Sequence, residues 1–341
     1  MKPTINKPAA KKVPEDNLYF SKPKDHLKFI SSGCSTLDCV LGGGWVLGRV
    51  SNVVGDKSTG KTLLAIEALV NFFRSYPKGV AKYNETEAAF DDEYANALGL
   101  DIRKVQRASS STVEELFDDL TAFVDGLQGK PGLYIVDSLD ALSDKAEMDR
   151  GIAEGSYGAS KPKQMGQLFR RLVRRLEESE VCVIIISQVR DAIGVTFGNK
   201  YTRSGGHALD FYATHILWLA HKGQIKKTVS KIQRTVGVSI KAKTSKNKAG
   251  QPFRECDFDI LFGYGVDDIS SGLEFLKEAG RMDALGLGSG KDDALVTAFR
   301  KAFGAAPVSE QAEMREALTA AVRDVWYEIE RTFLPPKGKY A

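Results

Sequence analysis

Two spacings of apolar positions alternate along the chain, one typical of strands and one typical of helices. Short apolar runs predict strands at residues 50–54, 80–84, 133–136, 181–187 and 213–219. Segments with apolar residues every three or four positions predict helices at 62–76, 89–98, 112–127 and 165–179. The run Val181–Ile186 is apolar without alternation, which is typical of a strand buried on both faces. We therefore expect an α/β fold with a mostly parallel central sheet covered on both faces.

The pattern changes towards both ends of the chain. Residues 1–29 are rich in Lys and Pro and predict an arm that serves in oligomerisation. Beyond Ser270, the spacing predicts helices at 273–284, 292–303 and 309–332, with Ser309 as the N-cap of the last one. We expect three parts: the arm (1–29), the core (30–268) and a small helical C-terminal domain with a basic tail (269–341).

One glycine-rich turn carries the clearest chemistry. It follows the strand at 50–54 and fits G-x-x-x-x-G-K-[ST] with Gly55, Asp56, Lys57, Ser58, Thr59, Gly60, Lys61 and Thr62. In such a P-loop, backbone N–H groups surround nucleotide phosphates, and the next helix points its positive end at them. Lys61 would reach the β- and γ-phosphates, and Thr62 would ligate Mg²⁺. The chain is expected to bind a nucleoside triphosphate.

Carboxylates for the metal and for water follow two other predicted strands. Asp137 ends the apolar run 133–136, the usual place for the second acid of a Mg²⁺–nucleotide site. Hydrolysis also needs a group that orients the attacking water. Glu85 and Glu87 both follow the strand at 80–84, and their position alone does not separate them.

Gln188 stands between the predicted nucleotide site and a long loop. It ends the strand at 181–187 and precedes a loop from Asp191 to His207 that has four glycines and no hydrophobic period. Loops of this length in a compact domain are usually functional or disordered. An amide in this place would let the state of the nucleotide control the order of the loop.

Composition excludes several classes of protein. The 341 residues are 43% hydrophobic, enough for one large core and a smaller module. No apolar run approaches the ~20 residues of a membrane span, and the N-terminus lacks the apolar stretch of a signal peptide. The four cysteines have neither zinc nor disulfide spacing and indicate reduced thiols. We expect a cytoplasmic protein that does not enter membranes.

Positive charge is concentrated in two stretches without any acid. Residues 221–254 contain ten Lys and Arg, and residues 158–176 contain six. In the predicted helix 165–179 the arginines take the face opposite the apolar one. A basic stretch is often only a solvated face, but two of them, one beside a glycine-rich segment, favour contacts with the phosphate backbone of a nucleic acid.

Several motifs together resemble the bacterial-type RecA recombinases over roughly residues 30–280. The matching segments have the order and spacing of that family: Ile30–Asp38, Gly44–Arg49, the P-loop, Thr86–Asp91 with Tyr94-Ala95, Val136–Leu142, Lys145–Glu147, Ser187–Arg190, Ile193–Asn199, Gly205–Leu209, Lys246–Lys248 and Pro252-Phe253. The resemblance implies a RecA-type P-loop ATPase core with ATP and Mg²⁺ as ligands.

The resemblance also implies roles at the nucleotide. Glu87, rather than Glu85, would activate water, and Gln188 would sense the γ-phosphate. Asp91 and Tyr94 would contact adenine. Lys246 and Lys248 would reach across a subunit interface to the ATP of the neighbour, as an arginine finger does, and Phe211 would lie at that interface.

The resemblance places DNA on two loops. Lys161, Lys163 and Arg170 would form the first DNA-binding element, together with the loop around 147–161. Arg190 and the loop 191–206, including Ile193, Gly205 and Gly206, would form the second. Single-stranded DNA, double-stranded DNA and further copies of the chain in a helical filament are the implied partners.

The chain also departs from the family pattern. Lys163 stands where Arg is usual, and Asp210 stands where Lys usually precedes Phe211. The arm is short and lacks the long amphipathic helix of typical bacterial members, and the tail is basic where theirs is commonly acidic. The last two departures favour a member encoded by a phage or another mobile element.

The leading expectation is a DNA-dependent ATPase that polymerises on single-stranded DNA and promotes homologous pairing and strand exchange. A P-loop DNA-binding ATPase acting in repair or replication without strand exchange is the alternative. A small-molecule kinase would not need two acid-free basic stretches. A non-catalytic regulator would not need Lys61, Thr62, Glu87 and Asp137 together.

Overall fold

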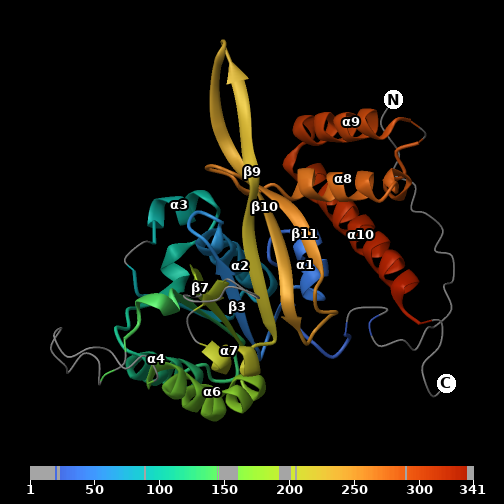
Figure 1. Ribbon diagram of the computed structural model, residues 1–341. Coiled ribbons are helices and arrows are strands. Elements are labelled where there is room, and N and C mark those ends of the chain that lie inside the picture. Colours follow the sequence, from blue (N-terminus) through green and yellow to red (C-terminus); the bar gives the residue numbers. More distant parts are fainter. Residues whose placement is uncertain are drawn as a thin grey trace.

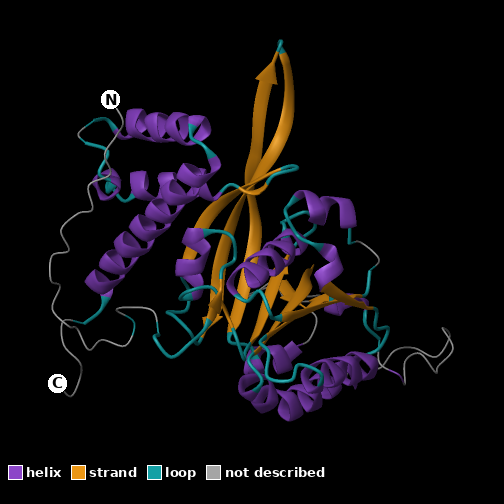
Figure 2. Cartoon of the chain, turned by 180° about the vertical axis from the view of Figure 1, so that it is seen from behind, coloured by secondary structure: helices purple, strands orange, loops and turns teal. Residues whose placement is uncertain are grey.

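The computed structural model describes residues 20, 24–87, 90–143, 145, 160–191, 201–203, 206–288 and 290–335. Side chains at 160–162, 190, 191, 201, 202, 206 and 207 are not described. A central sheet runs through the α/β part, and helices cover both of its faces (Figures 1 and 2). No helix in these ranges is both long and apolar enough to cross a membrane.

The sheet has the strand order β12-β11-β10-β9-β3-β7-β6-β4-β5, and β8 pairs with β7 at one end. Neighbours from β9 to β5 run parallel, whereas β9, β10, β11 and β12 pair antiparallel. The strands are β1 (Phe29–Ile30), β2 (Trp45–Val46), β3 (Val50–Gly55), β4 (Val80–Glu85), β5 (Val105–Ala108), β6 (Gly132–Asp137), β7 (Val181–Asp191), β8 (Tyr201–Arg203), β9 (His215–Val229), β10 (Ile232–Asn247), β11 (Glu255–Leu261) and β12 (Gly265–Val266).

Helices link the parallel strands and follow the last ones. They are α1 (Ser35–Leu41), α2 (Lys61–Ser75), α3 (Asp92–Ala97), α4 (Val113–Asp125), α6 (Ser160–Glu178), α7 (Gly206–Tyr212), α8 (Asp268–Glu278), α9 (Asp292–Ala305) and α10 (Val308–Phe333). Short 3-10 turns cover Ile102–Lys104, Leu139–Ala141 and Met282–Leu285.

Alternating side chains of the central strands fill two cores. In β7, Cys182, Ile184 and Ile186 pack with α1 and α2, whereas Val181, Val183 and Ile185 face α4 and α6. Because successive side chains of a strand point to opposite faces, an unbroken apolar run is what a strand covered on both sides requires. The α/β class with a largely parallel central sheet is confirmed.

The C-terminal helices join the first of these cores. Side chains from α8, α9 and α10 lie in the same cluster as those of α1 and β11. Phe275 of α8 and Trp326 of α10 stack with ring centroids 5.7 Å apart, and Arg254 pairs with Glu330 of α10 at 2.7 Å. The boundaries proposed for the arm, core and C-terminal domain stay predictions.

Several element boundaries differ from the sequence expectation. The strand expected at 181–187 continues to Asp191 because it pairs with β8, so the expected loop 191–207 is interrupted by β8 and by α7. The helix expected at 89–98 begins at Asp92, since the Asp91 carboxylate accepts a hydrogen bond from the Tyr94 N–H and caps it. The strand expected at 213–219 begins at His215 and extends to Val229, and the helix expected at 165–179 begins at Ser160.

Of the three C-terminal helices, α9 begins at Asp292 as expected, whereas α8 and α10 begin earlier. The helix expected at 273–284 is α8, which begins at Asp268 behind the capping carboxylate of Asp267, followed by a separate 3-10 turn. Ser309 is not an N-cap. The Pro307 carbonyl accepts the first helical hydrogen bond, from the Gln311 N–H at 2.9 Å, which makes Pro307 the N-cap and places Ser309 inside α10.

Candidate nucleotide site and DNA-binding elements

The P-loop lies between β3 and α2, as its motif predicts. Gly60 has φ +83°, a backbone conformation that strains any other residue, and a Cβ there would also require the tip of the Ile260 side chain to move. The Lys61 ammonium donates to the Asp56 carbonyl at 2.7 Å, across the loop. Burial lowers the pKa of Lys61, and the Asp137 and Asp56 carboxylates oppose this shift. A bound triphosphate would replace the Asp56 carbonyl as the hydrogen-bond partner of the Lys61 ammonium.

Asp137 connects the P-loop to the neighbouring strands. Its Oδ2 accepts hydrogen bonds from the Thr62 hydroxyl at 2.7 Å and from the Tyr83 hydroxyl at 2.6 Å. Burial raises the pKa of Asp137, and the negative charge of Glu87 raises it further, while these two hydrogen bonds lower it. A carboxylate in this environment is stabilised by a nearby cation.

The chemistry of this pair fits Mg²⁺. A hydroxyl and a carboxylate oxygen are hard ligands, and Mg²⁺ usually binds one or two protein oxygens, substrate phosphates and water rather than a cage of side chains. Thr62 and Asp137 would hold the ion.

Glu87 and Gln188 meet beside Asp137, although 101 positions separate them. Gln188 Nε2 donates to Glu87 Oε1 at 3.0 Å, and the Ser138 hydroxyl donates to the same oxygen. Gln188 pairs in register with Gly55, where the P-loop begins. The Gln188 amide and the Glu87 carboxylate therefore lie on the side of the sheet towards which the carboxyl-terminal ends of β3, β6 and β7 point.

Glu85 has different partners. Its Oε1 accepts from the Phe90 N–H at 2.5 Å, and its Oε2 lies 3.4 Å from the Arg107 guanidinium. Arg107 also lies over the Phe90 ring, 3.9 Å from its centroid. These contacts hold Glu85 in a structural role and favour Glu87 as the group next to the nucleotide.

Tyr94 lines a cavity next to the P-loop. The cavity has about 250 Å³ and is also bordered by residues 58–63 and by Val238, Ile260 and Phe262. An apolar and aromatic wall next to a phosphate loop suits a nucleobase. Asp91, expected at adenine as well, has its carboxylate on the Tyr94 N–H at 2.9 Å and acts as the helix cap.

Lys246 lies in β10 and Lys248 directly after it. Their ammonium groups contact the end of α7 and not the P-loop of the same chain. The Lys246 ammonium donates to the Asp210 carbonyl and, at 2.9 Å, to the Phe211 carbonyl, and Lys248 lies 3.4 Å from the same Phe211 oxygen. Burial and the charge of Lys248 lower the pKa of Lys246 to about 8. The Phe211 side chain is 77% exposed, so an apolar ring and two ammonium groups share one surface.

The first predicted DNA element is the basic face of α6. Its apolar residues, among them Leu168, Phe169 and Leu172, are buried, and Lys163 and Arg170 are exposed. Arg175, on the same helix, pairs with Asp125, so part of the arginine face is neutralised within the chain. Lys161 lies in α6, and residues 146–159 of the expected loop are outside the described ranges.

The second predicted DNA element is only partly described. Arg190 lies in β7 and Gly206 begins α7, while Ile193 and Gly205 are outside the described ranges. The base of the element is the antiparallel pairing of Val189 with Arg203 and of Asp191 with Tyr201. Arg203, whose side chain is 6% exposed, pairs with Asp210 at 2.5 Å. Asp210, the departure from the family pattern, thus ties α7 to β8.

The comparison with known proteins decides the family. A family model described as the RecA N-terminal domain matches residues 17–267. The chain belongs to the RecA family.

Individual RecA proteins match over most of the chain. "Protein RecA" of Synechococcus sp. (strain CC9605) is 36% identical over 256 residues, which cover 74% of this chain and 65% of that protein. The corresponding values for Synechococcus sp. (strain WH7803) are 35%, 280 residues, 78% and 70%, and for Arthrospira platensis 35%, 254 residues, 74% and 66%. The matches thus span about two thirds of the length of these RecA relatives.

Sequence reasoning missed several side chains that shape the site of this RecA-family chain. Tyr83 and Ser138 hydrogen-bond to Asp137 and Glu87, and the Asp140 carboxylate accepts from the Gln188 N–H at 2.7 Å. Ser138 and Asp140 stand one and three residues after Asp137 in the sequence, a signal that could have pointed to them. Tyr83 offered none, because a Tyr in an apolar run predicts only core.

Proposed function

We propose that this chain is an ATP-dependent DNA recombinase. It forms helical filaments on single-stranded DNA, hydrolyses ATP to ADP and phosphate when bound to DNA, and catalyses homologous pairing and strand exchange with a duplex. The observation that carries the proposal is the convergence of Lys61, Thr62, Asp137, Glu87 and Gln188 at one edge of the sheet, within a chain of the RecA family.

Each of these side chains has a distinct task in hydrolysis. Lys61 leaves the Asp56 carbonyl and neutralises the β- and γ-phosphates. Thr62 and Asp137 would hold Mg²⁺, which would supply further positive charge at the phosphates. Glu87 accepts a proton from the attacking water, and Gln188, bonded to Glu87, responds to the γ-phosphate.

The side-chain amide of Gln188 couples the binding of ATP to the binding of DNA. Gln188 lies in β7, two residues before Arg190, the first residue of the second DNA element. A γ-phosphate that draws Gln188 away from Glu87 changes the start of that element, so ATP favours one loop arrangement and DNA favours the same one. Basic side chains such as Lys163 and Arg170 then bind backbone phosphates with little preference for sequence.

A neighbouring subunit completes the site. Lys246 and Lys248 are bonded to α7 and present their charge next to the exposed Phe211. In a filament this surface docks on the P-loop side of the next copy, and the two ammonium groups add positive charge at its γ-phosphate. Rapid hydrolysis therefore depends on polymerisation.

Electron microscopy combined with a strand-exchange assay tests the proposal. With single-stranded DNA and a slowly hydrolysed ATP analogue, the protein should form regular helical filaments, and Lys61→Ala on its own, without subunits that have an intact P-loop, should form none because the triphosphate lacks its main cation. With ATP, the same filaments should exchange strands with a homologous duplex. Filaments without exchange would instead favour an ATPase acting in repair or replication.

The pKa of Lys246 predicts how assembly depends on pH. Because this pKa is lowered to about 8 in the free subunit, a growing fraction of Lys246 is neutral above that pH, whereas contact with a neighbouring triphosphate requires the charged form. ATP-dependent assembly should therefore take up protons and weaken as the pH rises from about 8 to about 9.

Lys246→Arg provides the control, since a guanidinium stays charged throughout this range. The measurement is the protein concentration needed for half-maximal filament formation at each pH, by light scattering. The arginine variant should lose the dependence above about pH 8 whatever its absolute affinity. Identical pH profiles for both proteins would show that Lys246 does not titrate during assembly.

A further inference from the structure

The β9–β10 hairpin is longer than the sheet requires. The pairing of β9 with β3 ends at Leu219, and the pairing of β10 with β11 begins at Gly237. Residues 226–235, the hairpin tip, therefore pair only with each other and project beyond the body of the molecule (Figures 1 and 2). At about 3.3 Å per residue, the tip reaches roughly 20 Å past the sheet.

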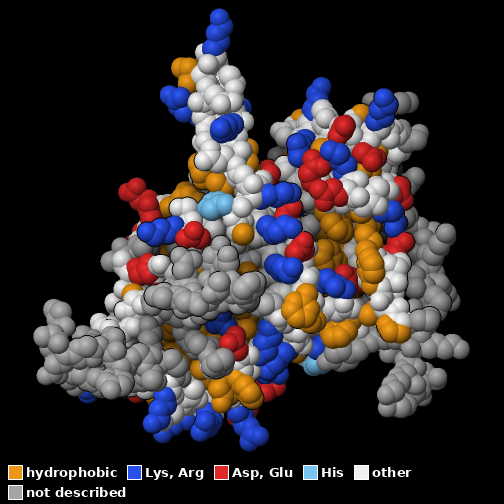
Figure 3. Space-filling view, viewed as in Figure 1, with side chains coloured by type: hydrophobic (Ala, Val, Ile, Leu, Met, Phe, Trp, Pro, Cys, Tyr) orange, Lys and Arg blue, Asp and Glu red, His pale blue; other side chains and the backbone are white. Residues whose placement is uncertain are grey.

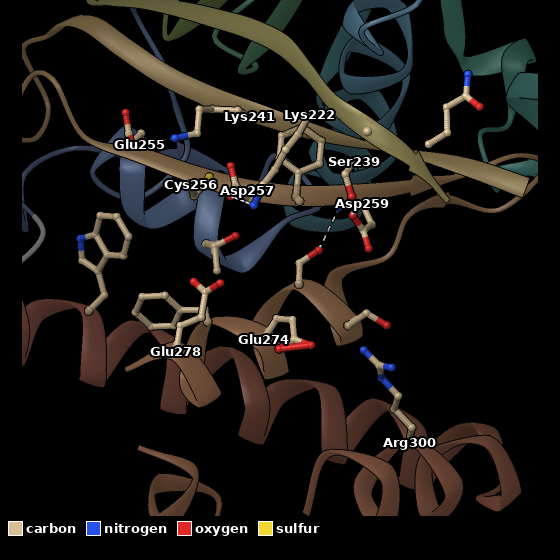
Figure 4. Close-up of a pocket in the computed structure, with 18 residues that line it drawn as sticks. Lys222, Ser239, Lys241, Glu255, Cys256, Asp257, Asp259, Glu274, Glu278 and Arg300 are labelled. Atoms are coloured by element: carbon tan, nitrogen blue, oxygen red, sulfur yellow. Dashed lines mark hydrogen bonds and ion pairs between the residues drawn. The ribbon is translucent and has the colours of Figure 1, made fainter. Parts of the chain in front are cut away.

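The lysines at the base of the hairpin have acidic partners, whereas the cations at its tip have none among the described residues. At the base, Lys222 pairs with Asp257 at 2.5 Å, and Lys241 and Lys243 pair with Glu255 at 2.8 and 3.3 Å. Lys222 and Lys241 lie over these two acids on the wall of the cavity between the sheet and the C-terminal helices (Figure 4). Two acids of β11 thus offset two of the three positive charges at the base.

The tip carries cations without such partners. It holds Lys226, Lys227, Lys231 and Arg234 and no acidic residue. Throughout the ranges that the structure describes, none of the four forms an ion pair. Basic side chains stand out at the end of the hairpin in the space-filling view (Figure 3).

The strand register places these cations on both faces of the ribbon. Lys227 lies directly opposite Arg234, and Val229 lies opposite Ile232, so these four share one face. Lys226 lies opposite Thr235 on the other face. Two like charges in direct opposition destabilise a hairpin unless an anion neutralises them. Val229 and Ile232 are also 61% and 55% exposed, so both stay largely uncovered by the residues that the structure describes.

We propose that the hairpin tip binds duplex DNA by entering the major groove. A two-stranded β-ribbon is one of the two elements that fit this groove of about 12 Å, and single-stranded DNA offers no groove. Cations on both faces reach the phosphates of both strands, and the release of their counterions drives binding. This contact is separate from the two DNA elements near α6 and β7, and it does not depend on ATP.

The base of the hairpin touches the nucleotide loop. His221 Nε2 lies 3.2 Å from the Lys57 carbonyl, and β9 pairs with β3 up to Gly55. A duplex bound at the tip is therefore connected through β9 to β3, the strand that leads into the P-loop. Its approach is non-specific, because the cations contact phosphates rather than base edges.

Anisotropy of a labelled duplex of mixed sequence, titrated with the full-length protein over a range of salt concentrations, tests this proposal. Lys227→Gln combined with Arg234→Gln removes the opposed pair without loss of packing, since both side chains are exposed. The slope of log affinity against log salt should become shallower by about two, at about 0.9 per phosphate contact, and affinity at about 0.1 M salt should fall about tenfold or more. Lys226→Gln, on the other face, should flatten the slope by about one.

Lys78→Gln combined with Lys130→Gln is the matched control. It removes the same charge from exposed positions next to the amino ends of β4 and β6, on the opposite edge of the sheet. This variant should keep the wild-type slope. A duplex with bulky groups at C5 of its pyrimidines, which fill the major groove, should bind the wild type more weakly.

Three results would overturn the proposal: equal losses in the tip and control variants, unchanged binding of the duplex with the filled groove, or a tip defect confined to filament assembly. The last result would assign the tip to an acidic surface of another copy. The proposed recombinase function is tested separately, because filament formation on single-stranded DNA with an ATP analogue should be unaffected in the tip variant.

Discussion

Glu87→Gln lowers ATP hydrolysis by about two to four orders of magnitude and leaves ATP binding and filament assembly intact, if Glu87 activates the water. The reason lies in its contacts. Glu87 Oε1 accepts hydrogen bonds from Gln188 and Ser138, and a glutamine can accept both through its own oxygen. The substitution therefore removes the base and keeps the geometry. Steady-state phosphate release on single-stranded DNA measures the rate, and binding of a fluorescent ATP analogue measures the affinity.

Glu85→Gln is the matched control, since it changes the same functional group two residues away. Its carboxylate faces the Phe90 N–H and Arg107 instead of Gln188. We expect hydrolysis within a fewfold of wild type, together with some loss of stability from the weakened contact with Arg107. If Glu85→Gln abolished hydrolysis and Glu87→Gln did not, the two carboxylates would have exchanged roles.

The parts of the fold that sequence reasoning found share one property. The stretches 133–136 of β6 and 181–186 of β7 are apolar without interruption because both faces of the sheet are covered, and such runs are visible in the sequence. The P-loop was equally visible because its spacing follows from contacts within a few residues. Local patterns were sufficient wherever local contacts determine the structure.

The β9–β10 hairpin could not be recognised from local sequence patterns. Beyond Leu219 most side chains of β9 are polar and exposed, so no apolar period marked the strand, and its length is set by pairing with β10. The extension of β7 to Asp191 was missed for the same reason, because it depends on pairing with β8 across a segment of the chain. Strands stabilised mainly by a partner strand leave little signal in their own sequence.

The candidate site shows the same division. Lys61, Thr62 and Asp137 follow from motif spacing, whereas the choice between Glu85 and Glu87 depended on Gln188, which is 101 positions from Glu87. No pattern in the sequence joins these two residues. The resemblance to RecA recombinases implied the role of Glu87, and the contacts of both carboxylates now support it on physical grounds.

A mixture of two inactive proteins should regain ATPase activity if Lys248 acts on the neighbour's ATP. Lys61→Ala removes the main phosphate cation, and Lys248→Ala removes the charge next to Phe211. Each interface of a filament joins the P-loop of one subunit to the Lys248 surface of the next, because head-to-tail contacts are heterologous. In an equal mixture, roughly a quarter of the interfaces combine an intact P-loop with an intact Lys248, and activity should recover to about that fraction.

The composition of the mixture provides the controls. Activity should peak at equal amounts and fall towards zero at either extreme, since it follows the product of the two fractions. Lys248→Ala mixed with the double variant Lys61→Ala, Lys248→Ala should stay inactive, because no subunit then offers an intact Lys248. Energy transfer between labels on the two proteins shows whether the filaments are mixed. If mixed filaments stay inactive at every ratio, Lys248 acts on its own subunit or not at all, and its bond to the Phe211 carbonyl is structural.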